Sequence, residues 1–115
     1  MSVSQSFFYK IGDPGATIRL RLTVGQGQKG ATVVRLGDTL IAESNEDIVE
    51  IPIGTGAEVR GRKLFCTTVV TDVNPQTNLT SITWEITGGA EFFVKSCTES
   101  LDRGGDSVLY VAVVY

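Results

Sequence analysis

The last stretch of the chain, Ser107-Val108-Leu109-Tyr110-Val111-Ala112-Val113-Val114-Tyr115, decides the fold. Eight consecutive apolar residues follow Ser107, and most of them are β-branched or aromatic, which is the composition of a strand. A strand with one solvated face alternates apolar and polar residues, whereas this one is apolar on both faces. Both faces therefore need cover, either from other layers of the chain or from another subunit.

The overall composition also favours strands over helices. Val, Ile and Thr number 14, 8 and 13, while Ala numbers only 6 in a chain of 115 residues. A chain of this length suits one domain with one core, so we expect residues 1–115 to form a single domain.

Short strand patterns separated by turn signals run along the whole chain. The first predicted strand is Phe7–Ile11, which the turn sequence Gly12-Asp13-Pro14-Gly15 stops. The cleanest alternation follows at residues 17–24, with Arg19 and Arg21 on its solvated face. Further strand patterns occupy residues 31–36, 39–43, 48–53, 64–73, 79–87 and 90–97.

Three of these segments carry positional information. Gly37-Asp38 predicts a tight turn that makes residues 31–36 and 39–43 antiparallel neighbours. Pro52 cannot donate to a strand ladder, so residues 48–53 are expected at a sheet edge. Residues 64–73 are apolar on both faces and compete with the C-terminal stretch for a central position.

Together these patterns predict an all-β fold of about eight or nine strands and no substantial helix. Residues 64–73 and 107–115 are each apolar on both faces. Such strands are easier to accommodate in a two-sheet sandwich, with a partner protein covering the outer side, than in a small barrel. We therefore expect a two-layer antiparallel β-sandwich, immunoglobulin-like or jelly-roll in outline.

The residue inventory argues against an enzyme and predicts no cofactor. Histidine is absent, so neither a Ser-His-Asp nor a Cys-His arrangement can form, and the two cysteines are too few for a four-ligand zinc site. The sequence Gly25-Gln26-Gly27-Gln28-Lys29-Gly30 matches a dinucleotide fingerprint, but a strand pattern follows it where a helix is required. We interpret it as a flexible strand-to-strand loop. Cys66 and Cys97 are compatible with one disulfide or with two reduced thiols.

Charge and hydropathy limit the expected partners. The net charge is −3 and the pI is near 4.8, so we expect no general attraction to nucleic acid. No stretch has the roughly 18 to 20 apolar residues of a membrane span, and residues 1–6 lack the features of a signal peptide. Cellular localisation stays open.

Two kinds of ligand site are candidates. Calcium would take carboxylate and carbonyl oxygens in end loops, although Asp beside Gly is also ordinary turn chemistry. Trp84, Tyr9 and Tyr110 would form a sugar-stacking platform if they were exposed together. However, Trp84 alternates in phase with inward-facing isoleucines, which favours a core position. The candidate metal ligands are Asp72, Asn74, Asp102 and Asp106, and the candidate ligand or interface residues are Trp84, Tyr110, Tyr115, Arg60 and Arg62.

These observations favour a non-catalytic binding or structural module that self-associates through its apolar strands. Its partner would be a second copy or another protein. The alternative is a calcium- or carbohydrate-binding β-sandwich that uses end loops or an exposed aromatic face. We expect residues 107–115 to be the spine of the fold, with part of that strand also serving as the seam with a neighbour.

Overall fold

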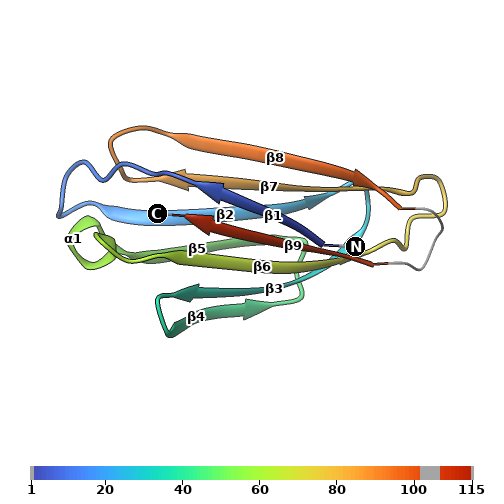
Figure 1. The fold of residues 1–115 in the computed structure, drawn as a ribbon, viewed down its shortest axis with the longest axis horizontal. Helices are drawn as coiled ribbons and strands as arrows, with labels where there is room; N and C mark the ends of the chain where they lie inside the picture. Colours follow the sequence, from blue (N-terminus) through green and yellow to red (C-terminus); the bar gives the residue numbers. More distant parts are fainter. Residues whose placement is uncertain (1, 102–106, 115) are drawn as a thin grey trace.

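The structure, a computed structural model, describes residues 2–101 and 107–114 as two packed β-sheets (Figure 1). Sheet A has the strand order β1-β9-β6-β3-β4, and sheet B has the order β5-β2-β7-β8. The predicted all-β sandwich is confirmed. The strands are β1 (Ser2–Phe7), β2 (Thr17–Gly25), β3 (Lys29–Leu36), β4 (Thr39–Ser44), β5 (Ile48–Thr55), β6 (Leu64–Thr71), β7 (Leu79–Thr87), β8 (Phe93–Ser100) and β9 (Ser107–Val114), and α1 (Gly56–Val59) is a single helical turn.

The amphipathic strands place their apolar side chains between the sheets, as their alternation predicts. In sheet B, β2 pairs antiparallel with β7 so that Leu22 lies opposite Trp84, and both side chains are buried. The edge position predicted from Pro52 is confirmed, because β5 is the outermost strand beside β2. The predicted pairing of residues 31–36 with 39–43 is the β3–β4 ladder.

The two strands that are apolar on both faces lie side by side inside sheet A. β6 is the central strand, and β9 lies between β6 and β1. On β9, the side chains of Val108, Tyr110 and Ala112 face sheet B and are fully buried. The C-terminal stretch is therefore an interior strand whose inner face forms part of the core.

The first strand differs from the prediction, which placed it at Phe7–Ile11. β1 is the serine-rich segment Ser2–Phe7, and it pairs in parallel with β9. Backbone hydrogen bonds to an apolar neighbour do not require apolar side chains, so composition did not reveal this strand. The chain leaves sheet A after Phe7, and Lys10 then accepts a backbone hydrogen bond from Ala90 beside sheet B.

The loop at residues 25–30 joins two strands, as predicted. Gln26 and Gly27 adopt positive φ angles of 61° and 69° there, and Gln28 turns inward and is 1% exposed. The Gln28 side chain bonds to backbone groups of the β6–β7 connection. The glycines thus serve a turn between strands.

The two cysteines are free and lie in different sheets. Cys66 is on β6, and burial raises the pKa of its thiol to about 12. Cys97 is on β8 and accepts a long contact of 4.0 Å from the Gln5 side-chain amide.

Candidate functional site

The aromatic candidates belong to the core. Trp84 is 1% exposed and its ring centroid lies 5.4 Å from that of Phe7. Tyr110 is fully buried, and its hydroxyl lies 2.7 Å from the hydroxyl of Thr80. Neither ring presents a face to solvent, and Tyr115 is outside the described residues. The aromatic surface needed for sugar stacking is therefore not built from Trp84 and Tyr110.

The candidate metal ligands are only partly described. Asp72 is 2% exposed, and neither of its carboxylate oxygens has a hydrogen-bond partner within residues 2–101 and 107–114. The side chain of Asn74 bonds to the Gln26 carbonyl and to the Gln76 amide. Asp102 and Asp106 lie outside the described residues. In the part of the chain that the structure describes, no three His, Cys, Asp or Glu residues are grouped to hold a metal ion.

The basic candidates Arg60 and Arg62 line a cavity at one end of the sandwich. The cavity has a volume of about 580 Å³ and opens between the ends of the two sheets. Its apolar wall combines Ile18 of β2, Ile53 of β5 and Leu64 of β6. Its full lining is Phe8, Tyr9, Lys10, Ile11, Ile18, Leu36, Ile53, Val59, Arg60, Gly61, Arg62, Lys63, Leu64, Ile86 and Val114.

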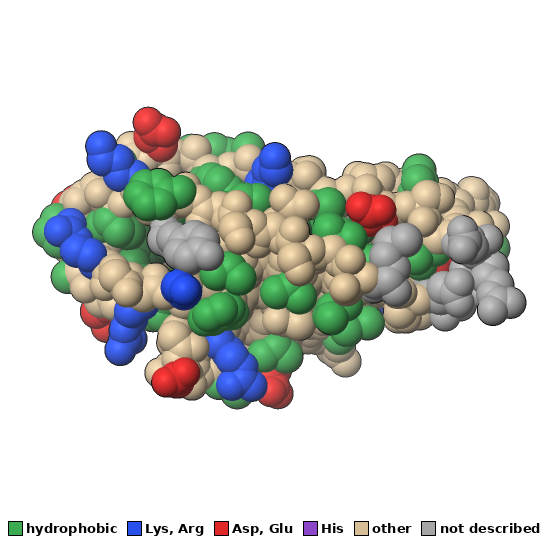
Figure 2. Space-filling view, in the orientation of Figure 1, with side chains coloured by type: hydrophobic (Ala, Val, Ile, Leu, Met, Phe, Trp, Pro, Cys, Tyr) green, Lys and Arg blue, Asp and Glu red, His purple; other side chains and the backbone are tan. Residues whose placement is uncertain are grey.

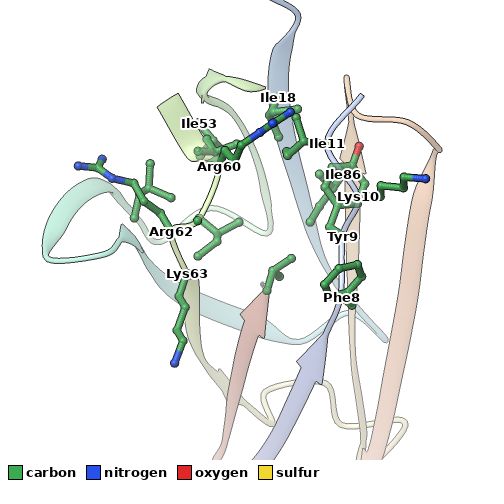
Figure 3. Close-up of a pocket in the computed structure, with 15 residues that line it drawn as sticks. Phe8, Tyr9, Lys10, Ile11, Ile18, Ile53, Arg60, Arg62, Lys63 and Ile86 are labelled. Carbon is green, nitrogen blue, oxygen red and sulfur yellow. The ribbon is translucent and has the colours of Figure 1, made fainter. Parts of the chain in front are cut away.

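The mouth of this cavity is positively charged. Lys10, Arg60, Arg62 and Lys63 line it, and no Asp or Glu is found among its described lining residues. Figure 3 shows Arg60 extending across the opening toward Ile11 and Ile18, while Arg62 and Lys63 extend outward. The arrangement is an apolar interior below a cationic rim.

Helix α1 fixes the start of this basic segment. The Thr55 hydroxyl accepts a hydrogen bond of 3.3 Å from the Glu58 amide, and the Glu58 carboxylate accepts one of 3.0 Å from the Thr55 amide. Hydrogen bonding of the Glu58 carboxylate to the Thr55 backbone amide, and then to the Thr55 side chain, lowers the pKa of Glu58, and nearby Arg62 lowers it further. The sequence analysis did not predict this helical turn, although Thr-x-x-Glu at residues 55–58 is the signature of a capping box.

A second feature is the outer face of sheet A, defined by Phe65, Thr67 and Val69 of β6, Leu109, Val111 and Val113 of β9, and Val33 of β3. The ladder aligns them in rows, since Phe65 pairs with Val113, Thr67 with Val111 and Val69 with Leu109. Val69 is 41% exposed, and the others are partly shielded by one another. Figure 2 shows hydrophobic side chains interspersed with other side chains across the middle of the molecule.

The outer face of sheet B is more polar, although Ile48 of β5 and Val94 of β8 are exposed there. There Arg21 of β2 lies between Glu50 of β5 and Glu85 of β7 in the strand register. Hydroxyl side chains occupy neighbouring positions, and Thr83 bonds to Ser96 at 2.9 Å. Sheet B thus presents the solvated face expected of a half-buried sheet, whereas sheet A does not.

No family model, curated protein or solved structure matches this chain. Within the described residues, no helix is long and apolar enough to cross a membrane.

Proposed function

We propose that the protein is a non-catalytic structural or binding module that self-associates by packing the outer face of sheet A against a second copy. The observation that carries this proposal is the two-sided apolar character of β9. The chain covers the side of β9 that carries Val108 and Tyr110, and it leaves the side that carries Val111 as an apolar surface. A partly exposed apolar surface of this kind, which the chain itself does not cover, is typical of interaction sites.

The composition of the face fits a second copy as the partner. Its centre is apolar, and charges of both signs stand at its border, Lys29 and Arg35 on β3 and Glu43 on β4. An apolar centre with a polar rim is the usual anatomy of a protein interface. A two-fold axis would place one such face on another, which makes an isologous dimer.

The size of the face predicts reversible association. The whole outer surface of sheet A, with five strands of six to eight residues, measures roughly 20 by 26 Å, or about 500 Å² of flat area, and its three central strands carry the apolar residues. Side-chain relief brings the accessible area close to the ~600 Å² per partner at the lower end of specific interfaces. We therefore expect monomer and dimer to exchange with concentration.

Within the sandwich class, we infer an immunoglobulin-like outline in preference to a jelly-roll. The pairing of β2 with β5 and the order β3-β6-β9 correspond to the B–E pair and the C-F-G order of immunoglobulin sheets. The β7–β8 hairpin would then be an addition between the last two strands of that pattern, on the free side of β2.

Sedimentation equilibrium over a wide concentration range tests the proposal. The unmodified protein should shift from monomer toward dimer as its concentration rises. Val111→Lys places a charge at the centre of the outer face of sheet A and should leave a monomer at every concentration, because each contact would bury two unpaired cations.

Thr83→Lys is the matched control. Thr83 occupies the equivalent outward position on an interior strand of sheet B, so the same added charge there should leave the dimer intact. A strict monomer in the unmodified protein, or equal loss of dimer in both variants, would refute the proposal.

A further inference from the structure

The cavity at the α1 end of the sandwich combines an apolar interior with a concentration of positive charge. Four of the ten Lys and Arg residues line one opening in a chain whose net charge is −3. Figure 2 shows Lys and Arg side chains gathered at the end that carries α1. This local excess of positive charge runs against the charge of the whole chain.

The interior of the cavity offers dispersion contacts and few polar partners. Ile18, Ile53 and Ile86 project into it from sheet B, and all three are at most 8% exposed. Leu36 and Leu64 close it from sheet A. A volume of about 580 Å³ lies within the range of small-molecule pockets.

The positive charge at the mouth of the cavity favours a ligand whose head group is negatively charged. Arg60 extends across the opening, and no ion pair to Arg60 is found among the described residues (Figure 3). Arg62 is partly compensated by Glu58, whose own carboxylate is held by Thr55. Arg60 is therefore the cation best placed to meet an anionic group at the mouth.

From these observations, we propose that the cavity binds a single-chain amphiphile, with its alkyl chain between the two sheets and its anionic head group at Arg60. The head group is a carboxylate, as in a fatty acid, or a phosphate, as in a single-chain phospholipid. The cavity shares no residue with the outer face of sheet A, so this proposal does not depend on self-association.

Methyl NMR of the isoleucine side chains locates the ligand directly. Four of the eight isoleucines, Ile11, Ile18, Ile53 and Ile86, line the cavity. The other four, Ile41, Ile48, Ile51 and Ile82, serve as internal controls in the same spectrum. Titration with dodecanoate, kept below its critical micelle concentration, should shift the first four signals and leave the second four nearly unchanged.

A head-group series separates charge from hydrophobic contact. Dodecanoate should bind about three- to tenfold tighter than dodecanol, which is the gain expected from one or two partly exposed ion pairs. Dodecyltrimethylammonium should bind more weakly than dodecanol, because the cations of the rim repel it. Comparing dodecyl phosphate with dodecanoate identifies which anionic head group is preferred.

Two variants test the assigned residues. Arg60→Gln should lower dodecanoate affinity about three- to tenfold and leave dodecanol affinity unchanged, whereas Lys29→Gln at the opposite end of β3 should change neither. Ile11→Trp places a large side chain at the half-buried entrance and should weaken both ligands. Arg60 is exposed, so its variant tests the proposal even if Ile11→Trp does not fold.

The outcomes that overturn the proposal are distinct. Absence of isoleucine shifts, or shifts in the control group, places no ligand in the cavity. Equal affinities for the anionic and the cationic amphiphile would show that the cations at the mouth do not bind the head group. If the ligand leaves the signals of the cavity isoleucines unchanged and Val111→Lys abolishes binding, the alkyl chain binds to the outer face of sheet A instead.

Discussion

Gln28 is the polar side chain on which the connection between β6 and β7 depends. Its amide nitrogen donates to the carbonyls of Thr77 and Leu79 at 3.2 and 2.9 Å. Its amide oxygen accepts from the backbone amides of Val73 and Asn74 at 2.7 and 2.8 Å. One buried side chain therefore satisfies four backbone groups between Val73 and Leu79.

Replacing Gln28 with Leu keeps the volume and removes all four bonds. Each lost bond costs about 0.5 to 1.5 kcal/mol, and orphaned buried groups cost more. These backbone groups are only partly buried, so water can form hydrogen bonds with some of them in the variant. We therefore expect the free energy of unfolding to fall by about 3 kcal/mol. For a chain of this length that loss lowers the melting temperature by about 10 °C.

Urea unfolding followed by tryptophan fluorescence measures the loss, since Trp84 is the only tryptophan of the chain and lies in the core. Gln76→Leu is the control, because Gln76 is exposed in the same connection. If Gln28→Leu costs no more than Gln76→Leu, the connection is not held by Gln28 and the reasoning fails.

Four further predictions concern the core and α1. Tyr110→Phe removes a buried hydroxyl that bonds to Thr80 and should lower the free energy of unfolding by about 1 to 2 kcal/mol in urea titrations. In the native protein a thiol reagent should modify the half-buried Cys97 and leave Cys66 untouched until the chain unfolds, and modification of both at once would contradict the assigned burial. Burial raises the pKa of the Cys66 thiol from 9.0 to about 12, so the unfolded chain loses the thiol proton at a lower pH than the folded protein does. The free energy of unfolding should therefore fall as the pH rises from 9 to 12, and it should fall less steeply in Cys66→Ala. Thr55→Ala removes the cap of α1 and should cost about 1 kcal/mol, whereas Thr87→Ala at an exposed strand end should cost little.

Hydrophobic patterning predicted most of the sandwich because the two sheets share one buried layer, toward which every second side chain of a strand points. The alternation of β2 and β7 placed Leu22 and Trp84 in the core, and Pro52 placed β5 at an edge. The two apolar faces predicted for residues 64–73 and 107–115 favoured interior positions, and β6 and β9 lie inside sheet A. The side-chain pattern of a single strand is sufficient to predict whether its residues lie in the core and whether the strand lies at an edge or inside a sheet.

Features that depend on distant partners were not predictable in the same way. β1 is a strand because β9 supplies hydrogen bonds in parallel register, and its serines give no strand signal. The cavity is lined by Ile11, Ile53 and Val114, which come from three segments far apart in the sequence, so no sequence motif predicts it. Arg60 and Arg62 were singled out from charge alone, but their place above an apolar cavity follows from the ends of two sheets meeting beside α1.

The central claim is that the outer face of sheet A is the seam between two copies. A dilution series of leucine and valine methyl spectra tests it most directly. We predict that the signals of Val33, Val69, Leu109, Val111 and Val113 change with protein concentration. Those of the buried Val34, Val70 and Val108 should stay constant. Concentration-independent spectra, or changes confined to sheet B, would contradict the claim.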